Sequence, residues 1–175
     1  MNDNITGEHI SLIPFDATSP YLDEAVQVYI AAWPANEAEI RDFIRRYAGY
    51  PGFRGYVALL HNEVVGMGFG TQSLPGQWWH DKVAAHVAPN HPALQDAWVL
   101  VDLAVLPAYR SHGIGTLLHN ALLGSQPYRW ALLSTEVSNA GSRRLYERLG
   151  WGYLHTGFVF NPGQQPFVVM CREVR

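Results

Sequence analysis

Residues 98–106 (WVLVDLAVL) form a nearly unbroken apolar run that holds one charged residue, Asp102. A β-strand has this composition when both of its faces are covered by other layers of the fold. Pro107 ends the run, because proline cannot continue the hydrogen bonding of a strand. The chain is therefore expected to build a sheet with this segment as its central strand.

The hydrophobic spacing on either side of this run predicts alternating secondary structure. Strands are expected at residues 9–14, 53–60, 63–69 and 129–135, and helices at 22–33, 37–47, 114–123 and 140–149. Two hairpins are also predicted, one turning at His61-Asn62 and a final one across Asn161-Pro162-Gly163. The order is that of a mixed α/β fold.

Residues 74–96 are rich in Pro, Trp, His and Asn and lie between two predicted strands. A connection longer than about 12 to 15 residues is commonly a functional loop or a short helical insertion. This segment is therefore predicted to be an insertion that covers a site.

The turn after the central strand, residues 107–116, is called the glycine turn below. Glycines at 113 and 115 allow a ligand to approach the backbone, and the free N–H groups of the helix that follows suit a pyrophosphate. Arg110 can add a charge-assisted contact. The turn lacks the Gly-Lys-Ser/Thr of a Walker loop, and it lacks the third glycine of the GxGxxG fingerprint. A plain tight turn is the alternative explanation.

Here the sequence resembles the GNAT N-acetyltransferases, whose acetyl-CoA motif is [Arg/Gln]-x-x-Gly-x-[Gly/Ala] between a strand and a helix. The motif reads RSHGIG at residues 110–115, and NAGSRRLYERLGW at residues 139–151 is similar to the family's second motif. Trp151 stands where phenylalanine is commoner, and the segment 74–96 is longer than the family core requires. The match covers roughly residues 98–151.

The resemblance implies a fold and a co-substrate. The fold would be a central mixed, mostly antiparallel, twisted sheet of about six to seven strands with about four flanking helices and splayed central strands, formed as one domain over residues 1–175. The splay would lie near residues 103–105, opposite 133–135. Acetyl-CoA would contact Leu103, Ala104, Val105, Arg110, Ser111, His112, Gly113, Ile114, Gly115, Thr116, Asn139 and Tyr146.

The resemblance also implies catalytic roles. Tyr146 is the candidate general acid, because a phenol can protonate a departing CoA thiolate; a core tyrosine is the alternative. Asn139 would cap a helix, contact the CoA arm, or do both. The acceptor amine needs a base, for which Glu136 is the first choice and Asp102 the second. Glu136 lies three residues before the asparagine rather than the family's five, and Asp102 could instead form a structural salt bridge.

Four aromatic or imidazole side chains are candidates for the acceptor site. Trp78, Trp79 and His80 lie in the segment 74–96, and Trp33 ends the first predicted helix, where family members often shape that site. Tryptophans that pack an insertion onto the sheet, or that lie in the core, are the alternative.

Composition excludes several other classes of function. The formal net charge of -3 and the scattered basic residues argue against nucleic acid as a partner. Cys171 is the only cysteine, His80, His86 and His91 match no standard ligand spacing, and no metal is expected. No leader-like start and no stretch near 18 apolar residues is seen, so no membrane contact and a cytoplasmic location are expected.

Three functions compete on these observations. The first is an enzyme that transfers acetyl from acetyl-CoA to a primary amine, of a small molecule or a peptide, by direct attack in a ternary complex. The second is a catalytically silent CoA-binding sensor or interaction module, and the third is a nucleotide-binding protein of another family. The glycine turn together with Tyr146 favours the enzyme. A homodimer is compatible with the resemblance.

Overall fold

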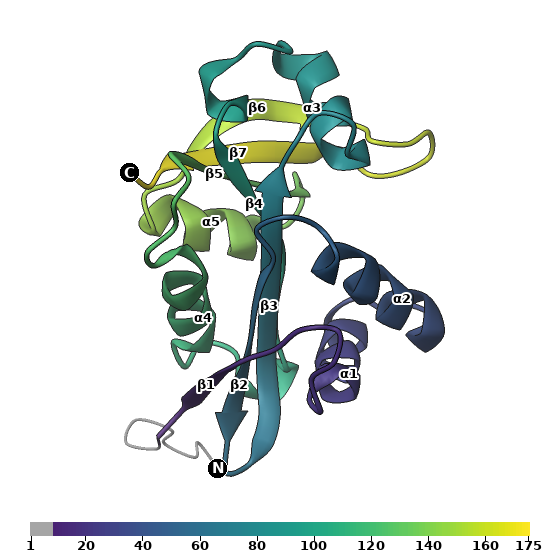
Figure 1. Cartoon of the computed structure of the whole chain (residues 1–175), viewed down its shortest axis with the longest axis vertical. Helices are drawn as coiled ribbons and strands as arrows, with labels where there is room; N and C mark the ends of the chain where they lie inside the picture. Colours follow the sequence, from purple (N-terminus) through teal and green to yellow (C-terminus); the bar gives the residue numbers. More distant parts are fainter. Residues whose placement is uncertain (1–8) are drawn as a thin grey trace. The chain divides into compact units, whose positions relative to one another are not determined.

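The computed structural model describes residues 9–175. Five α-helices and seven strands form in these residues (Figure 1). The helices are α1 (Leu22–Ala32), α2 (Glu37–Ala48), α3 (Trp78–Val87), α4 (Ile114–Leu123) and α5 (Ala140–Arg148). The strands are β1 (Ser11–Pro14), β2 (Arg54–Leu60), β3 (Glu63–Ser73), β4 (Ala97–Val105), β5 (Trp130–Glu136), β6 (Gly152–Phe158) and β7 (Phe167–Glu173). Two short 3₁₀ helices, η1 (Pro92–Leu94) and η2 (Pro107–Tyr109), flank β4.

The strands are hydrogen-bonded in the order β1-β2-β3-β4-β5-β7-β6. β4 pairs with β5 in parallel, whereas the pairs β1-β2, β2-β3, β5-β7 and β6-β7 are antiparallel. The predicted mixed, mostly antiparallel sheet is thereby confirmed. The additional helix relative to the expected number is α3, which occupies the middle of the predicted insertion.

The chain divides into two compact units. The first runs to Thr71 and includes Leu100–Gly124, and the second consists of Gln72–Val99 and Ser125–Arg175. β3 and β4 contribute residues to both units.

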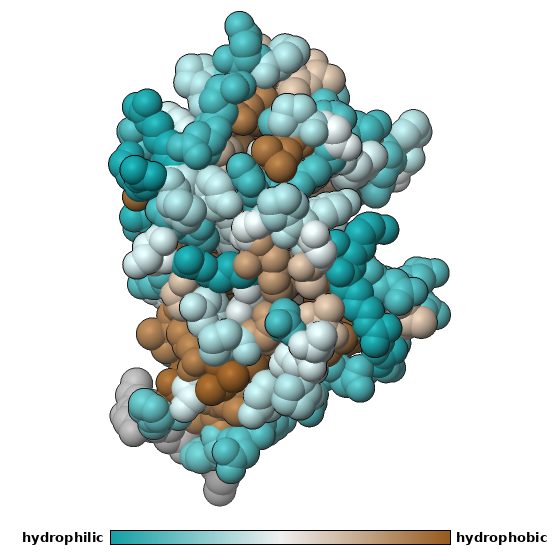
Figure 2. Space-filling model, in the orientation of Figure 1, coloured by the Kyte–Doolittle hydropathy of each residue, from teal (hydrophilic) through white to brown (hydrophobic). Residues whose placement is uncertain are grey.

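The first unit holds α1, α2 and α4 on its strands. Alternate residues of β2 enter two different clusters, Val57 and Leu59 with the helices α1 and α2, and Ala58 and Leu60 with α4. This alternation places the α1–α2 pair and α4 on opposite faces of the strands, since side chains along a strand alternate between faces. α2 is amphipathic, and Figure 2 shows a hydrophilic surface over it.

The β2–β3 hairpin is confirmed, with a two-residue turn between Leu60 and Glu63. His61 and Asn62 both have positive φ, 50° and 64°. Positive φ at both central residues is the geometry of the tight turn whose twist matches that of two antiparallel strands.

The second unit is built on β5, β7 and β6, with the first residues of β4 paired to β5. α3 contacts β6, and η1 contacts β5. The predicted final hairpin is confirmed, although its connection spans residues 159–166 rather than a tight turn at 161–163. The segment 74–96 therefore forms ordered structure within this unit.

Candidate functional site

The glycine turn lies in the first unit, directly after β4. The Leu106 N–H donates to the Val65 carbonyl oxygen at 2.9 Å, and η2 follows at Pro107. Ser111 and Gly113 adopt positive φ, 64° and 82°. A Cβ added at Gly113 would meet no atom within 4 Å, so space is open beside the backbone just before α4. The glycine is needed there for its left-handed conformation.

The start of α4 presents backbone donors. The first backbone bond of the helix runs from the Leu117 N–H to the Gly113 carbonyl oxygen at 3.0 Å. Helix geometry therefore leaves the N–H groups of residues 113–116 without an intrahelical acceptor. Gly113 contributes no capping side chain, and the first turn of α4 has no acidic residue. These donors and the positive end of the helix dipole suit an anionic ligand such as a pyrophosphate.

Two side chains of the turn contact its backbone. The Arg110 Nε–H donates to the Val105 carbonyl oxygen at 3.1 Å, and His112 Nδ1 lies 3.2 Å from the Tyr109 carbonyl oxygen. Both side chains are exposed. The Arg110 guanidinium keeps its two terminal nitrogen atoms for a ligand, while its Nε helps to hold the turn.

Leu103, Ala104 and Val105, predicted to contact the CoA arm, lie in the part of β4 that belongs to the first unit. The parallel ladder between β4 and β5 pairs Ala97–Val99 with Trp130–Leu132. The predicted splay concerns residues 103–105 and 133–135, which fall in different units. It stays a prediction.

Asp102 is half-buried in β4 and shares a face of the strand with Ala104. Ala104 belongs to the cluster formed with α1 and α2. Burial raises the pKa of Asp102 to about 8. Within residues 9–175, Asp102 takes part in no ion pair, so the structural salt bridge considered above is not found there. It is a carboxyl group without a compensating charge.

Two tyrosines from the adjacent helices lie in the electrostatic environment of Asp102. Burial first, and the Asp102 carboxylate second, raise the pKa of Tyr29 in α1. The pKa of Tyr47 in α2 is raised mainly by burial, then by Tyr50 and Asp102, and is lowered by Arg46. Helical spacing identifies both tyrosines as apolar-face residues, but it contains no signal that pairs them with Asp102.

Two candidate residues of the second unit, Glu136 and Asn139, lie just before α5. The Asn139 Oδ1 accepts from the Ser142 N–H at 3.1 Å, so the predicted helix cap is present. The Asn139 N–H donates to the Glu136 carbonyl oxygen at 3.0 Å. Glu136 ends β5 with an exposed side chain, which accepts from the Ser138 hydroxyl at 3.3 Å.

Tyr146 is a largely buried residue of α5, with 8% of its surface exposed. Its ring packs edge-on against Trp151 with 5.7 Å between centroids. Trp151 therefore supports Tyr146 from the position where phenylalanine is commoner in the second motif.

The predicted acceptor residues differ in exposure and lie in both units. Trp33 follows α1 in the first unit, is exposed, and packs on Tyr29 at 5.3 Å between centroids. In the second unit Trp78 is 52% exposed, and its ring packs against the ring of Phe160. The Trp79 Nε1–H donates to the Ser134 hydroxyl at 3.0 Å. Trp79 thus ties α3 to β5.

His80 is 3% exposed and its Nδ1 lies 2.9 Å from the Ser73 hydroxyl oxygen. Burial lowers its pKa. Nothing in the local sequence links Ser73 with His80 across the turn before α3, so this buried pair could not be predicted from pattern.

Within residues 9–175 no helix is both long and apolar enough to cross a bilayer. No group of three or more His, Cys, Asp or Glu side chains is arranged to hold a metal ion in that part of the chain.

Solved structures share this fold over almost the whole chain. An acetyltransferase of the GNAT family from Bacillus cereus superposes with a TM-score of 0.68 at 15% identity, covering 94% of this chain and 97% of its own. The ribosomal-protein-S18-alanine N-acetyltransferase from Escherichia coli superposes with a TM-score of 0.67 at 16% identity, covering 95% and 94%. At these identities the likeness establishes the fold.

Sequence similarity extends the comparison. A GCN5-like protein acetyltransferase of Mycobacterium tuberculosis is 29% identical over 126 residues, which are 66% of this chain and 61% of that protein. The chain thus spans less than two thirds of the length of that relative. Residues 20–151 match the sequence model of the "Acetyltransferase (GNAT) family". Since this match includes the glycine turn and α5, the chain belongs to the GNAT family of acetyltransferases.

Proposed function

We propose that the protein transfers the acetyl group of acetyl-CoA to a primary amine by direct attack in a ternary complex. The observation that carries the proposal is the glycine turn, whose open backbone at Gly113 and unbonded amides at the start of α4 suit the pyrophosphate of CoA. Acetyl-CoA supplies the acyl group as an activated thioester.

The residues present fit this co-substrate. Backbone N–H groups of residues 113–116 and the Arg110 guanidinium would hold the pyrophosphate, with Ser111 and His112 beside them. The backbone of residues 103–105 would align the pantetheine arm and polarise the thioester carbonyl. In the second unit, Asn139 would contribute its side-chain amide nitrogen, because its oxygen already caps α5.

For the general base we propose Asp102. A base works best when its pKa lies near the working pH, and burial raises the pKa of Asp102 to about 8. Asp102 also lacks an ion-pair partner within residues 9–175 that would hold its charge. Glu136, at the exposed end of β5, is the alternative base and is tested beside it.

For the general acid we propose Tyr146, whose phenol is protonated at neutral pH and can donate to the departing thiolate. Trp33, Trp78, Trp79 and His80 are the candidate side chains for contact with the acceptor. The proposed acceptor class is a primary amine of a protein or of a small molecule. The M. tuberculosis relative is named a protein acetyltransferase, which supports a protein acceptor.

The experiment is a calorimetric titration of acetyl-CoA and desulfo-CoA into wild type, Gly113→Glu and Gly113→Ala. Both variants carry the same backbone strain at φ 82°, but only the glutamate places a negative charge at the turn. We expect micromolar affinity for wild type, a loss of about 100-fold or more for the glutamate variant, and about tenfold or less for the alanine variant.

Equal losses in the two Gly113 variants would show that the turn is structural. A wild type that binds acetyl-CoA but releases no thiol with a library of amines would favour the silent CoA-binding module. If the wild type does not bind acetyl-CoA, the proposed acetyltransferase function is wrong. With turnover in hand, Tyr146→Phe tests the acid, with an expected loss in kcat of about 10- to 100-fold.

A further inference from the structure

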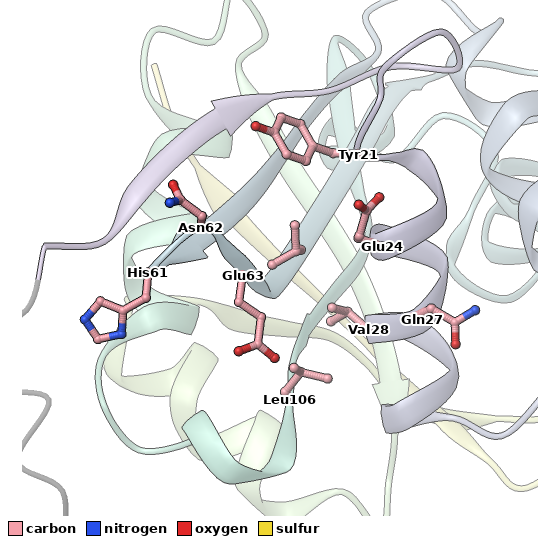
Figure 3. A pocket seen from close by; sticks show the side chains of 9 residues that line it. Tyr21, Glu24, Gln27, Val28, His61, Asn62, Glu63 and Leu106 are labelled. Atoms are coloured by element: carbon pink, nitrogen blue, oxygen red, sulfur yellow. The ribbon is translucent and has the colours of Figure 1, made fainter.

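A cavity of about 420 Å³ opens in the first unit, and none of the residues assigned above to acetyl-CoA or to catalysis lines it. Its lining comes from α1, the β2–β3 turn and the end of β4 (Figure 3). The lining residues are Tyr21, Glu24, Gln27, Val28, His61, Asn62, Glu63, Val64 and Leu106. The volume lies within the range of small-molecule sites.

The lining combines apolar surface with negative charge. Val28 and Val64 are buried and, together with Leu106, supply the aliphatic part of the wall. Glu24 and Glu63 bring carboxylates from two different elements, and no lysine or arginine lines the cavity. In Figure 3 the ring of His61 points away from the cavity.

Both carboxylates are exposed to solvent, and neither has a cation as a partner within residues 9–175. Glu24 and Glu63 are in no ion pair there, and the interaction found for Glu63 is with the Tyr109 hydroxyl, which donates to its Oε2 at 3.4 Å. Two unpaired carboxylates beside aliphatic surface match the chemistry of a compact cation that carries methyl or methylene groups.

We propose that this cavity is a binding site for a small organic cation, held between Glu24 and Glu63 with its alkyl part on Val28, Val64 and Leu106. The site is linked to the glycine turn. Tyr109, whose hydroxyl donates to Glu63, is the last residue of η2, and Leu106 is the residue just before η2. A cation on Glu63 competes with the Tyr109 hydroxyl, so its binding is expected to alter acetyl-CoA affinity, and acetyl-CoA to alter cation affinity by the same factor.

The test uses alkyltrimethylammonium ions, whose quaternary nitrogen has no proton and cannot be acetylated. Tetramethylammonium and butyltrimethylammonium are titrated by calorimetry at low ionic strength into wild type, Glu24→Gln and Glu63→Gln. Glu39→Gln, at an exposed glutamate of α2, is the matched control. We expect dissociation constants of roughly 0.1–5 mM for wild type, tighter for the butyl compound.

Each carboxylate variant should weaken binding about fivefold or more, whereas Glu39→Gln should leave it unchanged. Glu24→Gln leaves the Glu63–Tyr109 contact intact, so a loss in that variant is not explained by a disturbed turn. The proposal is overturned if neither ion binds at about 50 mM, or if both variants bind as wild type does. Acetyl-CoA binding, measured separately, reports on the proposed function independently.

Discussion

Asp102 shows how a single charged residue in an apolar strand acquires a reactive environment. Its neighbours in sequence are aliphatic, and the side chains that share its electrostatic environment, Tyr29 and Tyr47, come from α1 and α2. Desolvation penalises the ionised form, which is why the pKa rises to about 8. A pKa in this range is what the proposed role as general base requires.

At the residue scale, the pH dependence of turnover tests this role. If Asp102 is the base, kcat/KM rises as the pH increases through about 8, because only the carboxylate accepts a proton. Asp102→Asn should lower kcat about 10²- to 10⁴-fold and leave only the rise due to the acceptor amine near its own pKa. Glu136→Gln is the control. If Asp102→Asn keeps the wild-type dependence of kcat/KM on pH and Glu136→Gln loses the rise near pH 8, the base is Glu136.

The same residue makes a prediction about stability. The pKa of Asp102 is raised from 3.8 in the unfolded chain to about 8 in the folded protein. The folded state therefore binds the proton more tightly, and this contribution to stability is fully present below pH 3.8 and is lost as the pH rises to about 8.

The side chain that Asp102→Asn introduces cannot ionise, so the variant does not lose stability as the pH rises. It should therefore be more stable than wild type at alkaline pH. The gain in the free energy of unfolding should be on the order of a few kcal/mol at about pH 9 and smaller at about pH 5. Urea unfolding of both proteins at the two pH values measures it. A gain that does not depend on pH would contradict the assignment.

At the scale of elements, the two functional helices begin in different ways. α4 starts at Gly113 without a side-chain cap and leaves its amides for a ligand, whereas α5 starts at Asn139, whose oxygen accepts from the Ser142 N–H. A capped start stabilises the helix, and an uncapped start leaves donors for binding. The contrast is consistent with a binding role at α4 and with a role for Asn139 that is first structural.

The cap of α5 can be measured directly. Asn139→Ala should lower the free energy of unfolding by about 1 kcal/mol, and Asn139→Asp by less than about 0.5 kcal/mol, because aspartate keeps the acceptor oxygen. Urea unfolding gives the stabilities, and calorimetry gives the acetyl-CoA affinity of each variant. If Asn139→Asp keeps stability but weakens acetyl-CoA binding, the side chain at position 139 lies close to the co-substrate, through its amide nitrogen or through the added charge. If both variants match wild type in stability, the cap has no energetic role.

At the scale of the whole molecule, β3 and β4 each supply residues to both compact units. Unfolding one unit would interrupt strands that the other unit uses. We therefore propose that residues 1–175 behave as one domain.

Calorimetric unfolding should show a single transition whose calorimetric and van't Hoff enthalpies agree. Saturation with acetyl-CoA at about 100 times its dissociation constant should raise the free energy of unfolding by about 2.7 kcal/mol and shift that transition as a whole. Two resolved transitions, only one of which moves with acetyl-CoA, would show instead that the units unfold separately.

Much of the architecture could be predicted because it depends on local pattern. The apolar run at 98–106 became β4 within one residue at each end, and His61-Asn62 formed the expected hairpin turn. The structure of the segment 74–96 was harder to predict, because its prolines and tryptophans give no clear helical pattern for the ten-residue helix α3. For the candidate site, the motif located residues 110–115 and 139–151, while the choice between Asp102 and Glu136 stayed open.

The sequence by itself determined the order of elements, the glycine turn and the family, because hydrophobic period, proline, glycine and motif spacing act over a few residues. Only the tertiary structure decided which side chains meet across the chain. Asp102 is desolvated beside helices α1 and α2, which lie more than 50 residues earlier, and Glu24 and Glu63 face one cavity from separate elements. Burial and charge environment depend on these long-range contacts, which local pattern does not encode.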